Sequence, residues 1–118
     1  MTMDTSAVID MPTFEALKES MGVEFIGELV QTYTDETPQL LSALQDALAR
    51  GDNEAFRRAA HSIKSTSNSF GALEFGSLAK ELEMLGRDAR LEDAPGKVKL
   101  LVNDYPLVKD ALQALCSQ

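Results

Sequence analysis

The chain has 118 residues, of which 44% are hydrophobic, and nineteen Asp and Glu against eleven Lys and Arg give it a net charge of −8. This length and composition suit one hydrophobic core, so we expect a single domain over residues 1–118. The negative charge opposes binding to nucleic acid or to an anionic membrane surface, and one cysteine with one histidine can form neither an internal disulfide nor a structural zinc site.

Apolar residues recur at spacings of three and four along most of the chain, which predicts α-helices throughout. We expect a flexible N-terminus at residues 1–10 and a short helix over 12–21, which has proline in its first turn and Gly22 after its end. The second helix is expected over residues 23–50, and we favour one helix kinked at Pro38 over two separate helices. Seven residues lie near its apolar face: Phe25, Leu29, Tyr33, Leu40, Leu41, Leu44 and Leu48.

Three further helices follow from similar signals. Gly51 and Asp52 are typical of a helix stop followed by an N-cap, and they open a third helix, which Gly71 closes after Phe70. A fourth helix is predicted over residues 73–87. Its apolar residues are Phe75, Leu78, Leu82 and Leu85.

The last helix is expected over residues 95–116, with a kink at Pro106. Because the connections are short, successive long helices should pack antiparallel. The sequence therefore predicts an all-α fold, an up-down four-helix bundle with the short N-terminal helix as a lid.

The third helix carries the only histidine of the chain, His61, on its polar side. At about 100° per residue, five positions gather on the opposite, core-facing side: Phe56, Ala60, Ile63, Ser67 and Phe70. A lone histidine is more often buried or incidental than functional. Its position on the wheel argues against a core role and leaves an incidental surface histidine as the alternative.

The charge around His61 favours a functional role. Residues 55–73 include no acidic residue, whereas Arg57, Arg58 and Lys64 are positive. Nearby cations disfavour protonation of an imidazole and stabilise an anionic group on the ring. A neutral imidazole beside cations suits phosphoryl transfer, although cations on an exposed face are usually only solvated.

The segment AHSIKSTSNSFGA resembles the signature of histidine-containing phosphotransfer (HPt) domains. Members of that family have a histidine, a lysine three residues later, a glycine directly after the lysine, and a second glycine ten residues after the histidine. The matching residues here are His61, Lys64, Ser65 and Gly71, and the resemblance covers residues 10–115. Ser65 replaces the usual glycine on the partner-facing side, so access to the ring is narrowed without being closed.

The resemblance implies a phosphorelay carrier. His61 would take a phosphoryl group from the aspartyl phosphate of one receiver domain and pass it to the aspartate of another. The implied partners are receiver domains of response regulators and of a hybrid sensor histidine kinase. Lys64 would contact the phosphoryl oxygens, and Glu83 would either bond the other ring nitrogen or be a solvated carboxylate beside Lys80. The chain would need no cofactor, since magnesium would come from the receiver.

Four other residues have less specific assignments. Arg57 and Arg58 either steer the acidic pocket of a receiver domain or pair with Glu54 and acids on adjacent helices. Asn68 lies on the same partner-facing side. Gly71 is interpreted structurally, as a left-handed helix stop.

No GxxxxGK[ST] motif or other glycine-rich nucleotide cradle occurs, so we expect a transfer intermediate without its own ATP site rather than an enzyme. One alternative is a helical adaptor that binds receiver or kinase domains without being phosphorylated. A second is a small-molecule phosphotransferase, which would need an enclosed pocket lined by arginine. The absence of a signal-peptide pattern and of a long apolar run favours a cytoplasmic protein, which we expect to be a monomer.

Overall fold

The computed structural model describes residues 8–116, and all regular secondary structure in that range is helical. The elements are Met11–Met21 (α2), Val23–Arg50 (α3), Asn53–Ser69 (α4), Leu73–Arg87 (α5), the short 3₁₀ helix Leu91–Asp93 (η1) and Pro95–Cys116 (α6). The all-helical prediction is confirmed, and the five predicted helices agree with the observed ones to within about a residue. The sequence did not predict η1.

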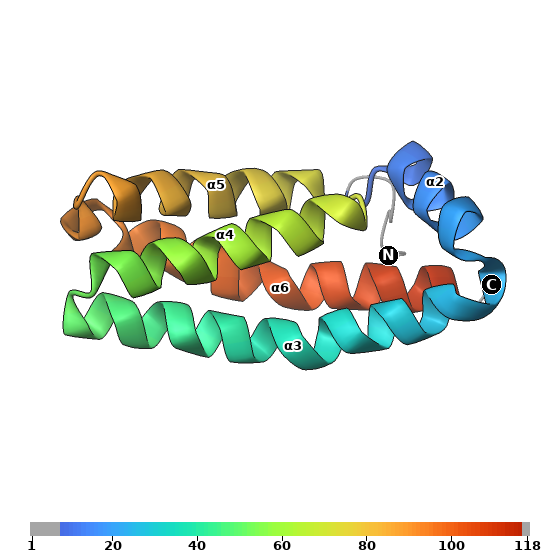
Figure 1. Ribbon diagram of the computed structural model, residues 1–118, viewed down its shortest axis with the longest axis horizontal. Coiled ribbons are helices and arrows are strands. Elements are labelled where there is room, and N and C mark those ends of the chain that lie inside the picture. Colours follow the sequence, from blue (N-terminus) through green and yellow to red (C-terminus); the bar gives the residue numbers. More distant parts are fainter. Residues whose placement is uncertain (1–7, 117–118) are drawn as a thin grey trace.

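The four long helices lie side by side (Figure 1). Helix α3 packs against α4 and α6, and α5 also packs against α4 and α6, so the contacts form a closed cycle. The most extensive of these contacts joins α4 to α5. Helix α2 crosses the end of the molecule where α4 stops and α3 starts, and it contacts both. The largest fully buried side chains include Phe14, Leu44, Phe56, Ile63, Leu82, Leu101 and Leu112.

Pro38 lies inside one continuous helix, α3. Because proline has no amide hydrogen, it leaves the carbonyl of Thr34, one turn earlier, without its helical partner. The hydroxyl of Tyr105 in α6 donates a hydrogen bond to that carbonyl over 3.2 Å. Both residues are buried. A side chain from another helix therefore satisfies a backbone acceptor that the proline would otherwise leave unpaired.

The buried face of α3 is rotated from the predicted apolar face. Phe25 is 57% exposed, whereas its neighbour Ile26, about 100° further around the helix, is buried. The predicted face omitted two buried polar residues, Thr34 and Thr37, whose hydroxyls bond to carbonyls of their own helix. The buried stripe of α3 thus includes Ile26 and these two threonines but not Phe25. Three of the predicted residues are only half-buried: Leu29, Leu40 and Leu48.

The segment before α2 differs from the predicted flexible N-terminus at residues 1–10. Ile9 is fully buried, and the side chain of Asp10 caps α2 by accepting a hydrogen bond from the amide of Thr13 over 3.2 Å. Packing of Ile9 and capping by Asp10 hold this segment against the helices. Residues 1–7 lie outside the described range.

The turn between α4 and α5 confirms Gly71 as a helix stop in the left-handed region, with φ of 90°. The same glycine also meets the N-terminal segment, because its carbonyl accepts a hydrogen bond from the amide of Asp10 over 2.7 Å. A Cβ at position 71 would lie only 2.7 Å from the carbonyl oxygen of Asp10. Glycine is therefore required both by the turn and by this close contact.

Candidate functional site

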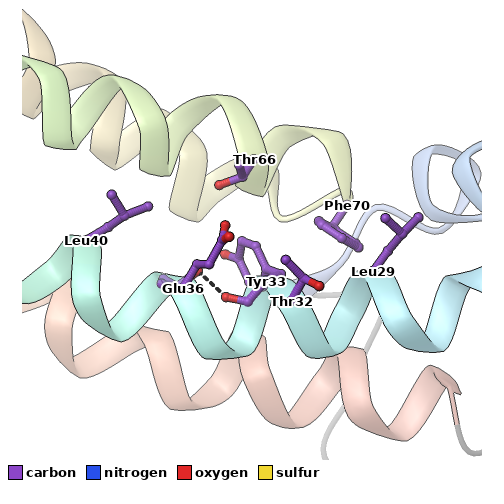
Figure 2. Close-up of a pocket in the computed structure, with 8 residues that line it drawn as sticks. Leu29, Thr32, Tyr33, Glu36, Leu40, Thr66 and Phe70 are labelled. Atoms are coloured by element: carbon purple, nitrogen blue, oxygen red, sulfur yellow. Dashed lines mark hydrogen bonds between the residues drawn. The ribbon is translucent and has the colours of Figure 1, made fainter.

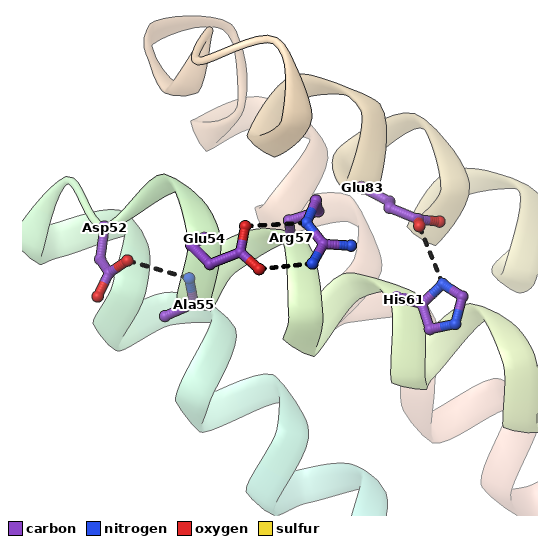
Figure 3. A network of polar contacts seen from close by, with 6 residues as sticks. All are labelled: Asp52, Glu54, Ala55, Arg57, His61 and Glu83. Atoms are coloured by element: carbon purple, nitrogen blue, oxygen red, sulfur yellow. Dashed lines mark hydrogen bonds and ion pairs between the residues drawn. The ribbon is translucent and has the colours of Figure 1, made fainter.

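The start of α4 is fixed by the predicted stop and cap. Gly51 ends α3 with φ of 68°, and the side chain of Asp52 accepts a hydrogen bond from the amide of Ala55 over 3.0 Å (Figure 3). From this start, all five positions predicted on the core side of α4 are buried. The side chain of His61 lies on the other side and is 54% exposed. The histidine is thus held at the surface by a well-anchored helix.

Two glycines bring α5 close to α4 on either side of the histidine. A Cβ at Gly86 would lie 3.0 Å from the backbone nitrogen of Arg57, and a Cβ at Gly76 would overlap the side chain of Asn68. Glu83 lies between these contacts and faces the histidine. Sequence reasoning missed both glycines. Their signal was available, since glycine inside a helix lowers its stability and often marks a close approach.

Glu83 holds the two motif residues together. Its Oε2 lies 2.9 Å from Nδ1 of His61, and its Oε1 lies 2.7 Å from Nζ of Lys64. The side chains of Glu83 and Lys64 are only 18% and 24% exposed. Of the two roles considered for this glutamate, the structure shows the one in which it bonds the imidazole. The pairing with Lys64 was not predicted.

The electrostatics of Glu83 determine which ring nitrogen is free. Burial by itself raises the pKa of this carboxyl, but hydrogen bonds from Lys64 and His61 outweigh burial and lower the pKa. Because the carboxylate carries no proton, Nδ1 of His61 is the donor in their hydrogen bond. In the neutral ring, Nε2 then keeps its lone pair. Figure 3 shows this nitrogen pointing away from Glu83.

Both the sequence and the structure of this chain are similar to those of known proteins. The family model described as Hpt domain matches residues 28–118. The chain belongs to the HPt family. Its structure is similar to the crystal structure of histidine-containing phosphotransfer protein B from Pseudomonas aeruginosa PAO1, with a TM-score of 0.86 and 28% sequence identity over 93% of this chain and 95% of that one. Comparison with curated proteins gave no match.

Two cations of the 55–73 segment of this HPt chain, Arg57 and Lys64, pair with carboxylates from outside the segment. Arg57 donates from Nε to Glu54 over 3.1 Å (Figure 3), and this hydrogen bond raises the pKa of Arg57 and lowers that of Glu54. Of the two roles considered for Arg57, the structure thus shows the pairing with Glu54, whereas the pairing of Lys64 with Glu83 was not predicted. A charge count over residues 55–73 leaves out both carboxylates, because Glu54 precedes the segment and Glu83 belongs to α5.

The remaining predicted partner-facing residues lie on α4, at the surface of the HPt chain. Arg58, Ser65 and Asn68 are all exposed, and they lie on the same helix as His61. The amide side chain of Asn68 lies over Gly76. The structure therefore presents these three side chains on the helix that carries the imidazole.

An open hollow of about 190 Å³ lies between α3 and α4 of the HPt chain (Figure 2). It is lined by Leu29, Thr32, Tyr33, Glu36, Thr37, Leu40, Thr66 and Phe70. The hydroxyl of Tyr33, one of these lining residues, lies 2.6 Å from the hydroxyl of Ser67. The lining includes no arginine, so this hollow does not provide the enclosed site that a small-molecule phosphotransferase would need.

Two further properties concern residues 8–116 of the HPt chain. In this range no three side chains of His, Cys, Asp or Glu are grouped closely enough to hold a metal ion. None of the helices formed there is both long and apolar enough to cross a membrane.

Proposed function

We propose that this HPt chain is a phosphorelay carrier and that His61 is the residue that carries the phosphoryl group. The observation that supports this role is the exposed ring whose Nδ1 donates to Glu83, since its Nε2 is left as a nucleophile open to solvent. In this proposal the helices form an up-down four-helix bundle that holds α4 and α5 in place. The chain has no ATP site of its own and depends on other proteins for its phosphoryl group.

The proposed reaction begins when a receiver domain bearing an aspartyl phosphate docks over α4. Nε2 of His61 attacks the phosphorus in line, the bond from phosphorus to the aspartate oxygen breaks, and its electron pair stays on the carboxylate. The phosphoryl group then leaves Nε2 for the aspartate of a second receiver. Magnesium is supplied by the receiver domain in both steps.

Lys64 is proposed to stabilise the phosphoryl oxygens during transfer. It lies one turn after His61 on the same helix and pairs with the same carboxylate as the ring, so its flexible stem can bring the ammonium group to phosphoryl oxygens on Nε2. A cation held there balances the negative charge of the moving group without forming a covalent bond to it.

The exposed residues around the ring are proposed to meet the receiver domain. Arg58 attracts its acidic pocket, and Asn68 offers a polar contact. Arg57 contributes less to this attraction because Glu54 neutralises it at close range. Ser65 lies beside the ring, where its hydroxymethyl group limits how closely the partner approaches.

The experiment is incubation with a receiver domain charged by acetyl phosphate. We expect the chain to gain a label that is acid-labile and alkali-stable, as phosphohistidine is, and to lose it to a second receiver. His61→Gln should bind the receiver but take no label. Binding by the wild-type chain without any label would support the adaptor alternative and overturn the carrier proposal.

A further inference from the structure

Glu83 is shared between two groups that the proposed reaction uses in different ways. Its Oε2 accepts a hydrogen bond from the ring, and its Oε1 pairs with the ammonium of Lys64 over 2.7 Å. The ring nitrogen that would carry the phosphoryl group points away from Glu83 (Figure 3). In the resting protein, Lys64 is therefore paired with the carboxylate rather than placed at the far side of the ring.

A phosphoryl group on Nε2 would compete for Lys64. It carries between one and two negative charges near neutral pH and three acceptor oxygens, whereas Glu83 carries one negative charge. The flexible stem of lysine allows its ammonium group to move between acceptors that lie on the two sides of one ring. The stronger acceptor should take the cation.

We propose that phosphorylation of His61 moves Lys64 from Glu83 to the phosphoryl oxygens. The carboxylate of Glu83 is then no longer neutralised by Lys64, and its full negative charge stabilises the proton on Nδ1. This inference rests on the proposed function of His61 and concerns how that site is regulated. Glu83 acts here as a positioning residue, since it touches the ring but not the phosphoryl group. The exchange couples the charge beside Nδ1 to the loading of Nε2.

The exchange has a chemical consequence for both transfer steps. On loading, the Nε2 lone pair forms the bond to phosphorus while the proton stays on Nδ1, so the ring becomes positively charged beside the freed carboxylate. On unloading, the electron pair of that bond returns to Nε2, and the leaving group is the neutral ring. If Nδ1 had lost its proton, the leaving group would be an imidazolate anion, which leaves far less readily. Retention of this proton keeps the loaded ring an effective donor.

Three other cations on the packed helices have carboxylate partners of their own. These pairs are Arg57 with Glu54 on α4, Arg87 with Asp88 at the end of α5, and Lys97 on α6 with Glu81 on α5. Lys80, one turn before Glu83, is exposed to solvent, and so is Arg58 on α4. Lys64 is thus the cation whose movement changes the charge balance at Glu83.

The test uses phosphoramidate, a small-molecule donor that phosphorylates histidine without any receiver domain. His61 is the single histidine in the sequence, so ¹⁵N spectra of the imidazole report one ring. The pH midpoint at which the ring passes from its cationic to its neutral form is measured for wild type and Glu83→Gln, before and after loading. This step removes the proton of Nε2 in the resting protein and the proton of Nδ1 in the loaded protein. We expect the substitution to lower the midpoint by roughly one pH unit in the loaded protein, as expected for loss of an adjacent opposite charge, and by clearly less in the resting protein.

The smaller resting effect is expected because Glu83→Gln also releases Lys64 into solvent, so an anion and a cation are lost together. In a Lys64→Met background this compensation is absent, and Glu83→Gln should lower both midpoints equally. Equal shifts in the two states with Lys64 present would overturn the exchange. This outcome is separate from failure of the proposed function, which would appear as loading by phosphoramidate but by no phosphorylated receiver.

Discussion

The hydroxyl of Tyr105 in α6 donates to the backbone carbonyl of Thr34 in α3, the carbonyl that Pro38 leaves without a helical partner. We expect Tyr105→Phe to lower the free energy of unfolding by roughly 1–3 kcal/mol, because a buried acceptor loses its donor. Pro38→Ala restores an amide at position 38 that can serve the same carbonyl. Urea denaturation of the double-mutant cycle should therefore show a smaller cost of Tyr105→Phe in that background, and an equal cost would contradict the pairing.

Tyr33 predicts a loss of stability at alkaline pH. Burial raises its pKa from 10.0 to about 12, despite the hydrogen bond with Ser67. A pKa that is higher in the folded state than in the unfolded one gives stability that is full below pH 10 and is lost as the pH rises toward 12. Tyr33→Phe should flatten this decline in unfolding free energy. Some decline should persist, because burial also raises the pKa of Tyr105; identical slopes in both proteins would refute the assignment.

The lowered pKa of Glu83 predicts the opposite dependence, a loss of stability at acidic pH. Lys64 and His61 lower its pKa below the ordinary 4.5 against the effect of burial, so its contribution to stability is present above pH 4.5 and is lost as the pH falls through the folded-state value. The difference in unfolding free energy between wild type and Glu83→Gln should shrink below pH 4.5. His61→Gln is the control variant, and its free energy of unfolding is measured at neutral pH. It changes an exposed side chain and should stay within about 0.5 kcal/mol of wild type.

The close contact between Gly86 and Arg57 predicts that the spacing of α4 and α5 affects both stability and phosphoryl transfer. A Cβ there would lie 3.0 to 3.1 Å from backbone and Cβ atoms of Arg57, so Gly86→Ala must push the two helices apart. We expect lower stability and slower phosphoryl transfer, because Glu83 would be drawn away from His61. Gly27→Ala is the matched control. Nothing lies within 4 Å of its added Cβ, and the helix should gain up to about 1 kcal/mol. Equal behaviour of the two variants in thermal unfolding and transfer would show that the spacing is unimportant.

Lys64 and Ser65 predict changes of transfer rate in opposite directions. Lys64→Ala should leave His61 able to accept label but slow the transfer by an amount equivalent to roughly 1–3 kcal/mol, the usual cost of losing one electrostatic contact to a reacting group. Ser65→Gly should speed the approach of a receiver, at a cost of about 0.5–1 kcal/mol in helix stability. Both rates are measured with one receiver at fixed ionic strength. Unchanged rates in both variants would remove these two residues from the mechanism.

Features that depend on one helix alone could be predicted from the sequence. The buried face of α4 follows from the spacing of Phe56 and its partners, and Asp52 and Gly71 mark the helix ends by local backbone chemistry. The prediction for Phe25 failed because a helical wheel gives the direction of a side chain but not whether a neighbouring helix covers it. Buried threonines add to this error, since their hydroxyls bond within the helix and hide their polarity.

Features that depend on two helices could be predicted only in part. The contact of His61 with Glu83 was one of two alternatives, because it depends on how closely α4 and α5 approach. That distance is set by contacts of Gly76 and Gly86 with particular atoms of α4, which spacing along the chain does not reveal. The pairing of Lys64 with the same carboxylate depends on this distance too.

The placement of a single imidazole on one exposed face has a consequence for the order of events in the proposed relay. A donor and an acceptor must both reach Nε2 of His61 from the same side, so they compete for one surface and cannot occupy it together. Transfer through the chain is then sequential, with release of the first partner before the second can bind. An excess of unphosphorylated acceptor would occupy the surface and slow loading, so the relative abundance of the two partners would control the flow of phosphoryl groups.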